Sequence, residues 1–123
     1  MATRFQVDVV DYPTQREALH RVRQRVFVEE QQVPAALEID ALDPLSAHVL
    51  ARGSDGEPIG AGRLTPDGRI GRMAVLADWR GRGVGEALLL ALIGTVAGVI
   101  AGYSPAILRL ARPILTVVIG VPP

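Results

Sequence analysis

The residues best suited to bind a ligand form one short segment, residues 80–85, called here the glycine segment. Its members follow one another without interruption: Arg80, Gly81, Arg82, Gly83, Val84 and Gly85. The glycines carry no Cβ, so a ligand can approach the backbone closely. The arginines add positive charge. If a helix begins here, its first N–H groups lack partners within the helix and its dipole favours an anion. The segment therefore predicts a binding site for a phosphate or pyrophosphate.

The residues on either side supply a strand and a helix. Residues 70–76 form a short apolar run, which is typical of a strand. Residues 87–93 are rich in Ala and Leu, which favours a helix. A P-loop would need a Lys, and this sequence contains none. The dinucleotide fingerprint would need a Gly where Glu86 stands. Both of these phosphate-binding motifs are therefore excluded.

The motif that fits is Arg-x-x-Gly-x-Gly, at Arg80, Gly83 and Gly85. Together with the preceding strand and the sequence Trp-Arg-Gly at residues 79–81, it resembles the acetyl-CoA signature of the GNAT N-acetyltransferases. The resemblance covers about residues 4–95. It implies that the amides of the glycine segment hold the pyrophosphate of acetyl-CoA. It also implies that a strand pairs with the pantetheine arm, through Met73, Ala74 and Val75. The alternative is a tight strand-to-helix turn without a ligand.

Five carboxylates lie between positions 29 and 43: Glu29, Glu30, Glu38, Asp40 and Asp43. For each one alone, a solvated loop or a helix cap is the plainer explanation. The stretch as a whole resembles a GNAT subgroup whose first helix ends in Phe-Val-x-Glu-Gln, followed by Pro and Glu-x-Asp. In that fold the region lines the acceptor side of the cleft. The resemblance thus implies a negative wall for an amine, with Glu30, Glu38 or Asp40 as general base.

The same resemblance implies a mechanism in which a small-molecule amine attacks the thioester of acetyl-CoA directly. A backbone N–H near Ala74 or Val75 would bind the thioester oxygen, and Tyr103, the only late tyrosine, is the candidate acid. Residues 97–123 depart from the family pattern, which predicts a replaced or frame-shifted tail. Two alternatives therefore stay open: a domain that binds acetyl-CoA without chemistry, and a fragment whose apolar tail associates with membranes.

The other elements follow from local patterns. Alternation predicts a strand over residues 5–9, and residues 47–52 and 58–64 are further strands joined by turns at 54–56 and 65–68. Thr14 and Glu17 have the spacing of a capping box, which predicts a helix from Thr14 to about Gln31. A buried helix is expected over about residues 85–96. The expected fold is α/β (α+β) and GNAT-like, with a mixed, mostly antiparallel sheet and helices on both faces. A single domain spans 1–123, with an atypical tail at 97–123.

Composition narrows the partners. The 13 basic and 13 acidic residues balance, which argues against nucleic acid. The absence of cysteine fits a reducing cytoplasm. With two histidines and no ligand motif, no metal is expected. His48 should be neutral and bonded to a neighbour, whereas His20 has no evident partner. The uncharged run at 87–108 is long enough to raise a membrane span, but glycines and a proline interrupt it. A homodimer is left open.

Overall fold

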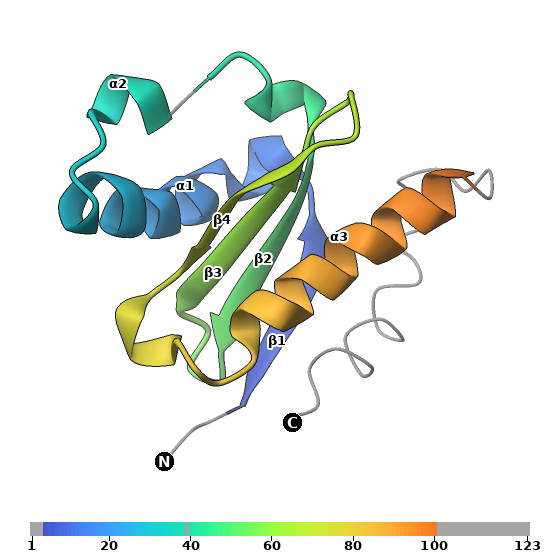
Figure 1. Cartoon of the computed structure of the whole chain (residues 1–123). Coiled ribbons are helices and arrows are strands. Elements are labelled where there is room, and N and C mark those ends of the chain that lie inside the picture. The colour runs from blue at the N-terminus through green and yellow to red at the C-terminus, as the bar shows by residue number, and fades with distance from the viewer. Residues whose placement is uncertain (1–3, 39, 101–123) are drawn as a thin grey trace.

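The computed structural model describes residues 4–38 and 40–100, and its centre is an antiparallel sheet (Figure 1). The strands follow the order of the chain and comprise β1 (Phe5–Val10), β2 (Ala47–Gly53), β3 (Pro58–Leu64) and β4 (Ile70–Val75). Every neighbouring pair is antiparallel. The β2–β3 and β3–β4 turns each contain a glycine with positive φ, at Gly56 and Gly68, which is the conformation that glycine adopts without steric cost. The predicted strands and the two turns that join them are confirmed.

One face of the sheet is covered by α1 (Tyr12–Arg23) and its π-helical continuation η1 (Gln24–Glu30). Leu19, Val22 and Val26 are buried there at helical spacing. The prediction that a capping box at Thr14 starts the helix is wrong. The helix begins at Tyr12 with Pro13 in its first turn, where a missing N–H has no helical partner to lose. The Thr14 hydroxyl instead donates to the backbone carbonyl of Asp11 at 3.2 Å.

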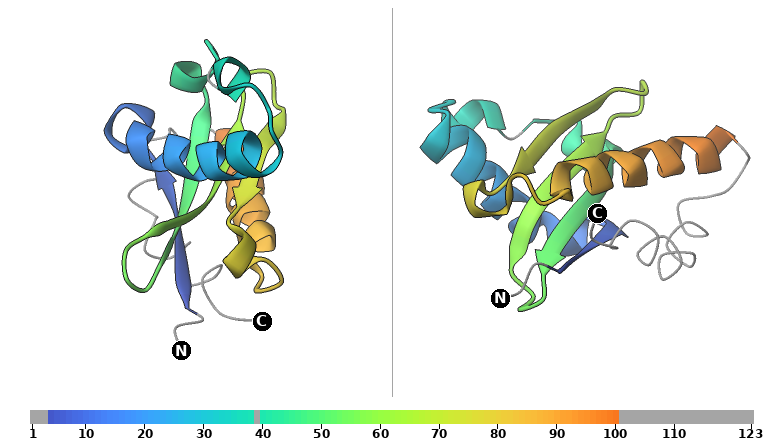
Figure 2. Two further views of the ribbon diagram at one scale, coloured as in Figure 1. Left: turned by 90° about the vertical axis from the view of Figure 1, so that its left-hand side faces the viewer. Right: turned by 60° about the horizontal axis from the view of Figure 1, so that its bottom comes forward.

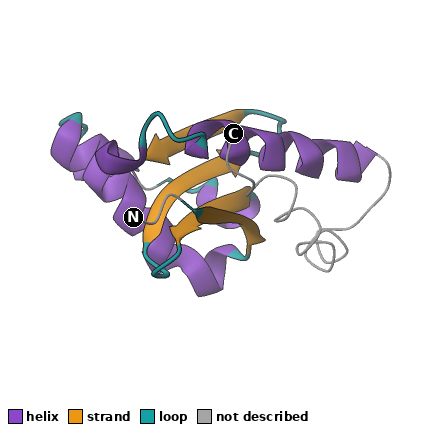
Figure 3. Cartoon of the chain, turned by 90° about the horizontal axis from the view of Figure 1, so that it is seen from below, coloured by secondary structure: helices purple, strands orange, loops and turns teal. Residues whose placement is uncertain are grey.

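The opposite face is covered by α3 (Val84–Ile100), which crosses the strands obliquely (Figure 2). Viewed from below, the strands lie between helices on either side (Figure 3). The inner side of α3 packs on alternate residues of β1, β2 and β3. This side is apolar and buried, and its residues are Val84, Ala87, Leu88, Ala91 and Leu92. The expected α/β arrangement with helices on both faces is therefore confirmed.

Three short helical pieces join these layers: α2 (Ala35–Glu38), η2 (Asp43–Leu45) and η3 (Ala77–Trp79). The first two each contain one of the five carboxylates, Glu38 in α2 and Asp43 in η2. Within residues 4–38 and 40–100, no helix has the length and apolar character needed to cross a membrane. Tyr103 and most of the atypical tail, residues 101–123, lie outside the described residues.

Candidate functional site

The glycine segment forms the turn between η3 and α3, and its backbone is shaped for close approach by a ligand. Gly81 and Gly83 have φ values of +77° and +86°. A Cβ placed on Gly81 would meet nothing within 4 Å, so this position faces open space. The Ala87 N–H donates to Gly83 O at 3.0 Å, as in a regular helix. The amides before Ala87 form the first turn of α3, where N–H groups have no partner within the helix. Such amides suit a phosphate oxygen. The geometry therefore fits the predicted anion site.

The side chains of the segment contribute unequally. Val84 is only 1% exposed, so its side chain belongs to the core. The Arg82 guanidinium lies over the Trp79 ring, 5.0 Å from its centroid. Arg80 donates from Nε to Val75 O at 3.0 Å and from Nη1 to Glu30 Oε2 at 2.9 Å. Glu30, a candidate base, is thus paired with Arg80, a candidate cofactor ligand.

Strand β4 carries an irregularity just before this turn. Ala61 pairs with Ala74 and Arg63 with Gly71, so two residues of β4, Arg72 and Met73, oppose the single Gly62. Such an extra residue is a β-bulge, which disturbs the ladder locally and bends the strand. Arg72 adopts a φ of +49°, which is uncommon for a residue other than glycine. The bulge marks the point at which Met73 and its neighbours leave the regular ladder.

Beyond the bulge, the backbone groups of β4, the last strand of the sheet, point alternately toward β3 and away from it. The Leu76 N–H donates to Ile59 O at 2.9 Å, so it points toward β3. Because successive residues of an antiparallel strand point to alternate sides, Val75 turns its N–H and carbonyl away from β3. Its carbonyl accepts Arg80 Nε. Of the two predicted oxyanion donors, Val75 rather than Ala74 has its N–H on the outer side of β4.

A pocket of about 290 Å³ lies beside the bulge and is called here the β4 pocket. Its lining comes from η1, the loop before α2, α2 itself and β4: Phe27, Val33, Glu38, Arg72 and Met73. Glu38 was predicted as a catalytic residue and Met73 as a cofactor contact. The structure brings these two together at one pocket. Glu30 lies instead at a separate pocket of about 270 Å³, next to Arg80.

The carboxylates of the acceptor side do not form a negative wall. Glu38 contacts Arg23 Nε at 2.5 Å, and Asp43 contacts Arg23 Nη1 at 2.9 Å. Asp40 Oδ1 accepts from Arg63 Nη1 at 2.7 Å, and its Oδ2 accepts from Arg72 Nη2 at 2.9 Å. Glu38, Asp40 and Asp43 each have an arginine partner, so these three carboxylates are balanced in charge. Glu38 and Asp43 are also buried, so the solvated-loop explanation is wrong for them.

These contacts lower the pKa of three of the carboxyl groups, Asp43, Asp40 and Glu30. Burial raises the pKa of Asp43, but hydrogen bonds and charge from Arg23 and Arg63 outweigh it, and the pKa lies below its usual value. The same balance lowers the pKa of Asp40, through Arg63 and Arg72. A hydrogen bond from Arg80 lowers the pKa of Glu30. A lowered pKa makes a carboxylate a weaker base, which disfavours Asp40 and Glu30 for that role.

Both histidines belong to this buried polar cluster. His48 Nε2 donates to the backbone carbonyl of Asp43 at 2.8 Å, and burial lowers the pKa of His48, as expected for a neutral imidazole. His20 does have partners, which the sequence did not reveal. Its Nε2 lies 2.6 Å from the Tyr12 hydroxyl, and its Nδ1 lies 3.0 Å from the carboxylate of Glu38. The only signal in the sequence was the spacing of Tyr12 and His20, which places both residues on the same side of the helix.

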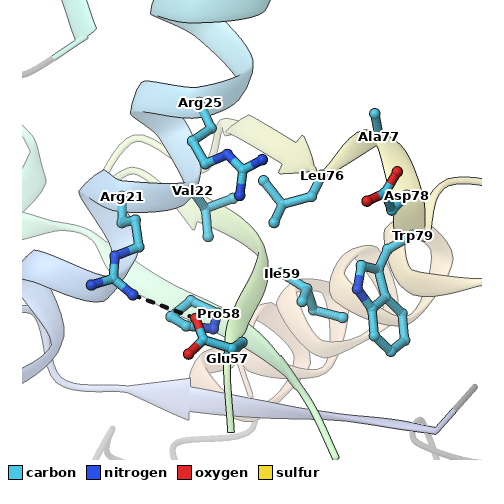
Figure 4. Close-up of a pocket in the computed structure, with 10 residues that line it drawn as sticks. All are labelled: Arg21, Val22, Arg25, Glu57, Pro58, Ile59, Leu76, Ala77, Asp78 and Trp79. Carbon is cyan, nitrogen blue, oxygen red and sulfur yellow. Dashed lines mark ion pairs between the residues drawn. The ribbon is translucent and has the colours of Figure 1, made fainter. Parts of the chain in front are cut away.

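Another pocket, of about 260 Å³, lies between α1 and η3 (Figure 4). Arg21 pairs across it with Glu57 at 3.5 Å, and Trp79 and Asp78 close its far side. None of the predicted catalytic residues lines it. Among residues 4–38 and 40–100, no group of His, Asp and Glu side chains is arranged to hold a metal ion.

Comparisons with known proteins agree on one family. The model of the acetyltransferase (GNAT) family matches residues 15–108. An uncharacterized N-acetyltransferase of Bacillus subtilis, YjcF, is 45% identical over 75 residues, which cover 58% of this chain and 52% of that protein. The chain thus spans about half the length of that relative.

Solved structures show the same fold. A putative N-acetyltransferase from Lactobacillus plantarum is 31% identical with a TM-score of 0.63, covering 72% of this chain and 64% of that one. An acetyltransferase of the GNAT family from Staphylococcus aureus Mu50 is 18% identical with a TM-score of 0.55, covering 72% of this chain and 64% of that one. At that identity the second likeness concerns the fold alone.

Proposed function

The chain belongs to the acetyltransferase (GNAT) family, and we propose that it transfers the acetyl group of acetyl-CoA to an amine of a small molecule by direct attack. The observation that carries the proposal is the β4 pocket. It joins Glu38, a carboxylate, to Met73 on the strand that leads into the glycine segment. A thioester beside Met73 and an amine beside Glu38 would meet in this pocket.

The binding of acetyl-CoA would use backbone groups more than side chains. The amides of residues 81–85 would hold the pyrophosphate, since Gly81 and Gly83 adopt positive φ and expose the turn. The outer backbone groups of β4 around Met73, Ala74 and Val75 would pair with the pantetheine arm, as a strand pairs with a peptide. Arg80 would then have to exchange Glu30 for a phosphate oxygen.

In the transfer step, nitrogen forms a bond to the thioester carbon, and the carbon–sulfur bond breaks. The amine must be neutral to attack, so a base removes its proton. We assign this role to Glu38, because it is the one of the three candidate carboxylates that lines the β4 pocket beside Met73. The Val75 N–H would stabilise the negative charge on the thioester oxygen. The leaving thiolate takes up a proton, for which Tyr103 remains the proposed donor.

We also propose a small-molecule amine as the acceptor and the cytoplasm as the location. The cytoplasmic location is supported by a composition without cysteine. Glu38 is only 2% exposed on its side chain, which supports a small acceptor that enters the β4 pocket.

The first test measures binding of acetyl-CoA by titration calorimetry in the parent chain and in Gly83→Glu. We expect a loss of at least about tenfold in affinity, because a side chain at φ +86° strains the turn and its carboxylate repels phosphate. Gly68→Glu is the matched control, since Gly68 has a φ of +89° in an open turn outside the glycine segment.

Equal losses in the two variants would mean that the glycine segment does not hold the pyrophosphate. A parent chain that binds acetyl-CoA is then assayed with a panel of small amines for release of free thiol. Binding without transfer to any of them would replace the proposed enzyme with a domain that only binds acetyl-CoA.

A further inference from the structure

We propose that His20 is a positioning residue that orients the carboxylate of Glu38, with Tyr12 holding His20 in the required tautomer. The inference rests on the proposed role of Glu38 as the base. Three side chains form a continuous hydrogen-bonded chain: the Tyr12 hydroxyl lies 2.6 Å from His20 Nε2, and His20 Nδ1 lies 3.0 Å from both oxygens of Glu38. None of these contacts was expected from the sequence.

The direction of each hydrogen bond follows from what the groups can donate. An ionised carboxylate only accepts, so His20 Nδ1 must carry the proton that lies between it and Glu38. In a neutral imidazole, Nε2 is then an acceptor, and the Tyr12 hydroxyl must donate to it. His48 has the opposite tautomer, because its Nε2 faces the carbonyl of Asp43, which only accepts. The chain therefore runs from Tyr12 through His20 to Glu38.

Glu38 needs this support because its own element is short. It is the last residue of α2, which is four residues long. Arg23 Nη2 donates to the backbone carbonyl of Glu38, which anchors its main chain. Arg23 Nε lies 2.5 Å from Oε1 of the carboxylate without a hydrogen bond to it. Because Arg23 crowds Oε1, we assign Oε2 as the oxygen that receives the amine proton.

The charged groups around the hydrogen-bonded series Tyr12–His20–Glu38 are mostly held in ion pairs. His20 Nε2 lies 3.9 Å from Asp43 Oδ2, and Asp43 is itself paired with Arg23 and Arg63. Arg72 lines the β4 pocket together with Glu38. Tyr12 is 8% exposed and stacks on the His48 ring with centroids 4.8 Å apart. Tyr12, at the far end of the hydrogen-bonded series, is therefore buried, and of the three side chains only Glu38 lines the β4 pocket.

Proton uptake is compatible with this arrangement. When the amine proton binds Oε2, Oε1 can still accept from His20 Nδ1 and keep its charge contact with Arg23. The heavy atoms need not move, so the carboxylate is held in one orientation before and after the transfer. Preorganisation of this kind is what a supporting residue contributes to a base.

The test compares two substitutions that differ only in where the side chain carries its amide. His20→Asn places an N–H donor at the position of Nδ1, and His20→Gln places it at the position of Nε2. We expect His20→Gln to lower kcat about tenfold, a part of the 10²–10⁴-fold that general base catalysis contributes. His20→Asn should retain more of kcat, and Tyr12→Phe should lose less than His20→Gln.

The affinity for acetyl-CoA, measured by calorimetry, should change by less than about twofold in all three variants, since a positioning residue acts on the reaction step. Equal kcat values for His20→Asn and His20→Gln would overturn the proposal. So would a loss of acetyl-CoA affinity that matches the loss of kcat.

A second measurement does not depend on activity. Nitrogen-15 NMR of the imidazole rings should show His20 protonated at Nδ1 and His48 at Nε2. Glu38→Gln should shift the His20 Nδ1 proton resonance, because a charge-assisted hydrogen bond is lost. A proton on Nε2 of His20 would overturn the proposal directly. The expected tautomer without any acetyl transfer would refute the proposed function but support the orientation of Glu38 by His20.

Discussion

At the scale of single residues, Arg80 shows that a ligand-binding side chain can be engaged by a protein partner. Its guanidinium is well suited to a pyrophosphate, because arginine binds phosphate with paired N–H groups. In the structure the same groups contact the carboxylate of Glu30 through both Nη1 and Nη2. Both side chains are exposed, so the pair is open to exchange. Glu30 therefore competes with the phosphate for Arg80.

Glu30→Gln should raise the affinity for acetyl-CoA about two- to fivefold, as expected when a competing exposed ion pair is removed. Titration calorimetry at low and high salt measures the change, and the gain should shrink at high salt. Glu29→Gln is the control, because Glu29 is exposed and lines the same pocket beside Arg80. An unchanged affinity in Glu30→Gln would mean that Arg80 does not contact the bound anion.

At the scale of elements, the position of the β4 bulge depends on how closely α3 packs on β3. Gly62 lies opposite Arg72 and Met73. A Cβ on Gly62 would come within 2.7 Å of Met73 Sδ and 3.1 Å of Leu92 and Val49. A side chain at this position would displace Met73 and press on Leu92 and Val49. The packing of α3 and the placement of a β4 pocket residue are therefore coupled.

Gly62→Ala should lower the free energy of unfolding by about 1–3 kcal/mol, the usual cost of inserting a group into a filled core. Urea denaturation measures this. Gly71→Ala is the matched control, since Gly71 lies in the neighbouring strand and a Cβ there would meet nothing within 4 Å. Should Gly62→Ala be as stable as Gly71→Ala, the close contact between α3, Met73 and β3 would be refuted.

The elements could be predicted from the sequence because their causes are local. Alternation along β1 and glycines at the turns need only neighbouring residues, and so does the strand–turn–helix order around residues 80–85. The start of α1 was misplaced because Pro13 fits the first turn of a helix as well as it ends a strand. The bulge at Arg72 has no local signal in the sequence, since arginine is not a residue type that favours a positive φ.

At the scale of the whole molecule, the two faces of the sheet differ in kind. The face under α3 packs on a large apolar cluster. The face under α1 carries an apolar cluster and, beside it, buried polar groups: Arg23, Glu38, Asp43, His48 and Arg63. These partners are 15 or more residues apart in several pairs. Such pairing depends on the tertiary fold, so the sequence predicted the carboxylates but not their arginines.

This buried polar cluster should make folding sensitive to acid. For His48, burial lowers the pKa from the ordinary 6.5, so the unfolded chain binds a proton that the folded chain does not. For Asp43, arginine contacts lower the pKa from the ordinary 3.8, and the unfolded chain again binds the proton first. In both cases stability rises with pH. Each group contributes fully to the stability at a pH above its ordinary pKa. This contribution is lost as the pH falls toward the lowered pKa of the folded protein.

The free energy of unfolding in urea, measured at about pH 7.5, 5.5 and 3.5, should therefore fall in two steps as acid is added. The upper step belongs to His48 and the lower one to Asp43 and Asp40. His48→Gln separates them, because Gln can place an N–H donor near the position of Nε2 and does not titrate. It should flatten the change between the two higher pH values and keep the change between the two lower ones. An upper step of unchanged size in His48→Gln would show that His48 is not the group that titrates there, and that the cause lies elsewhere in the cluster.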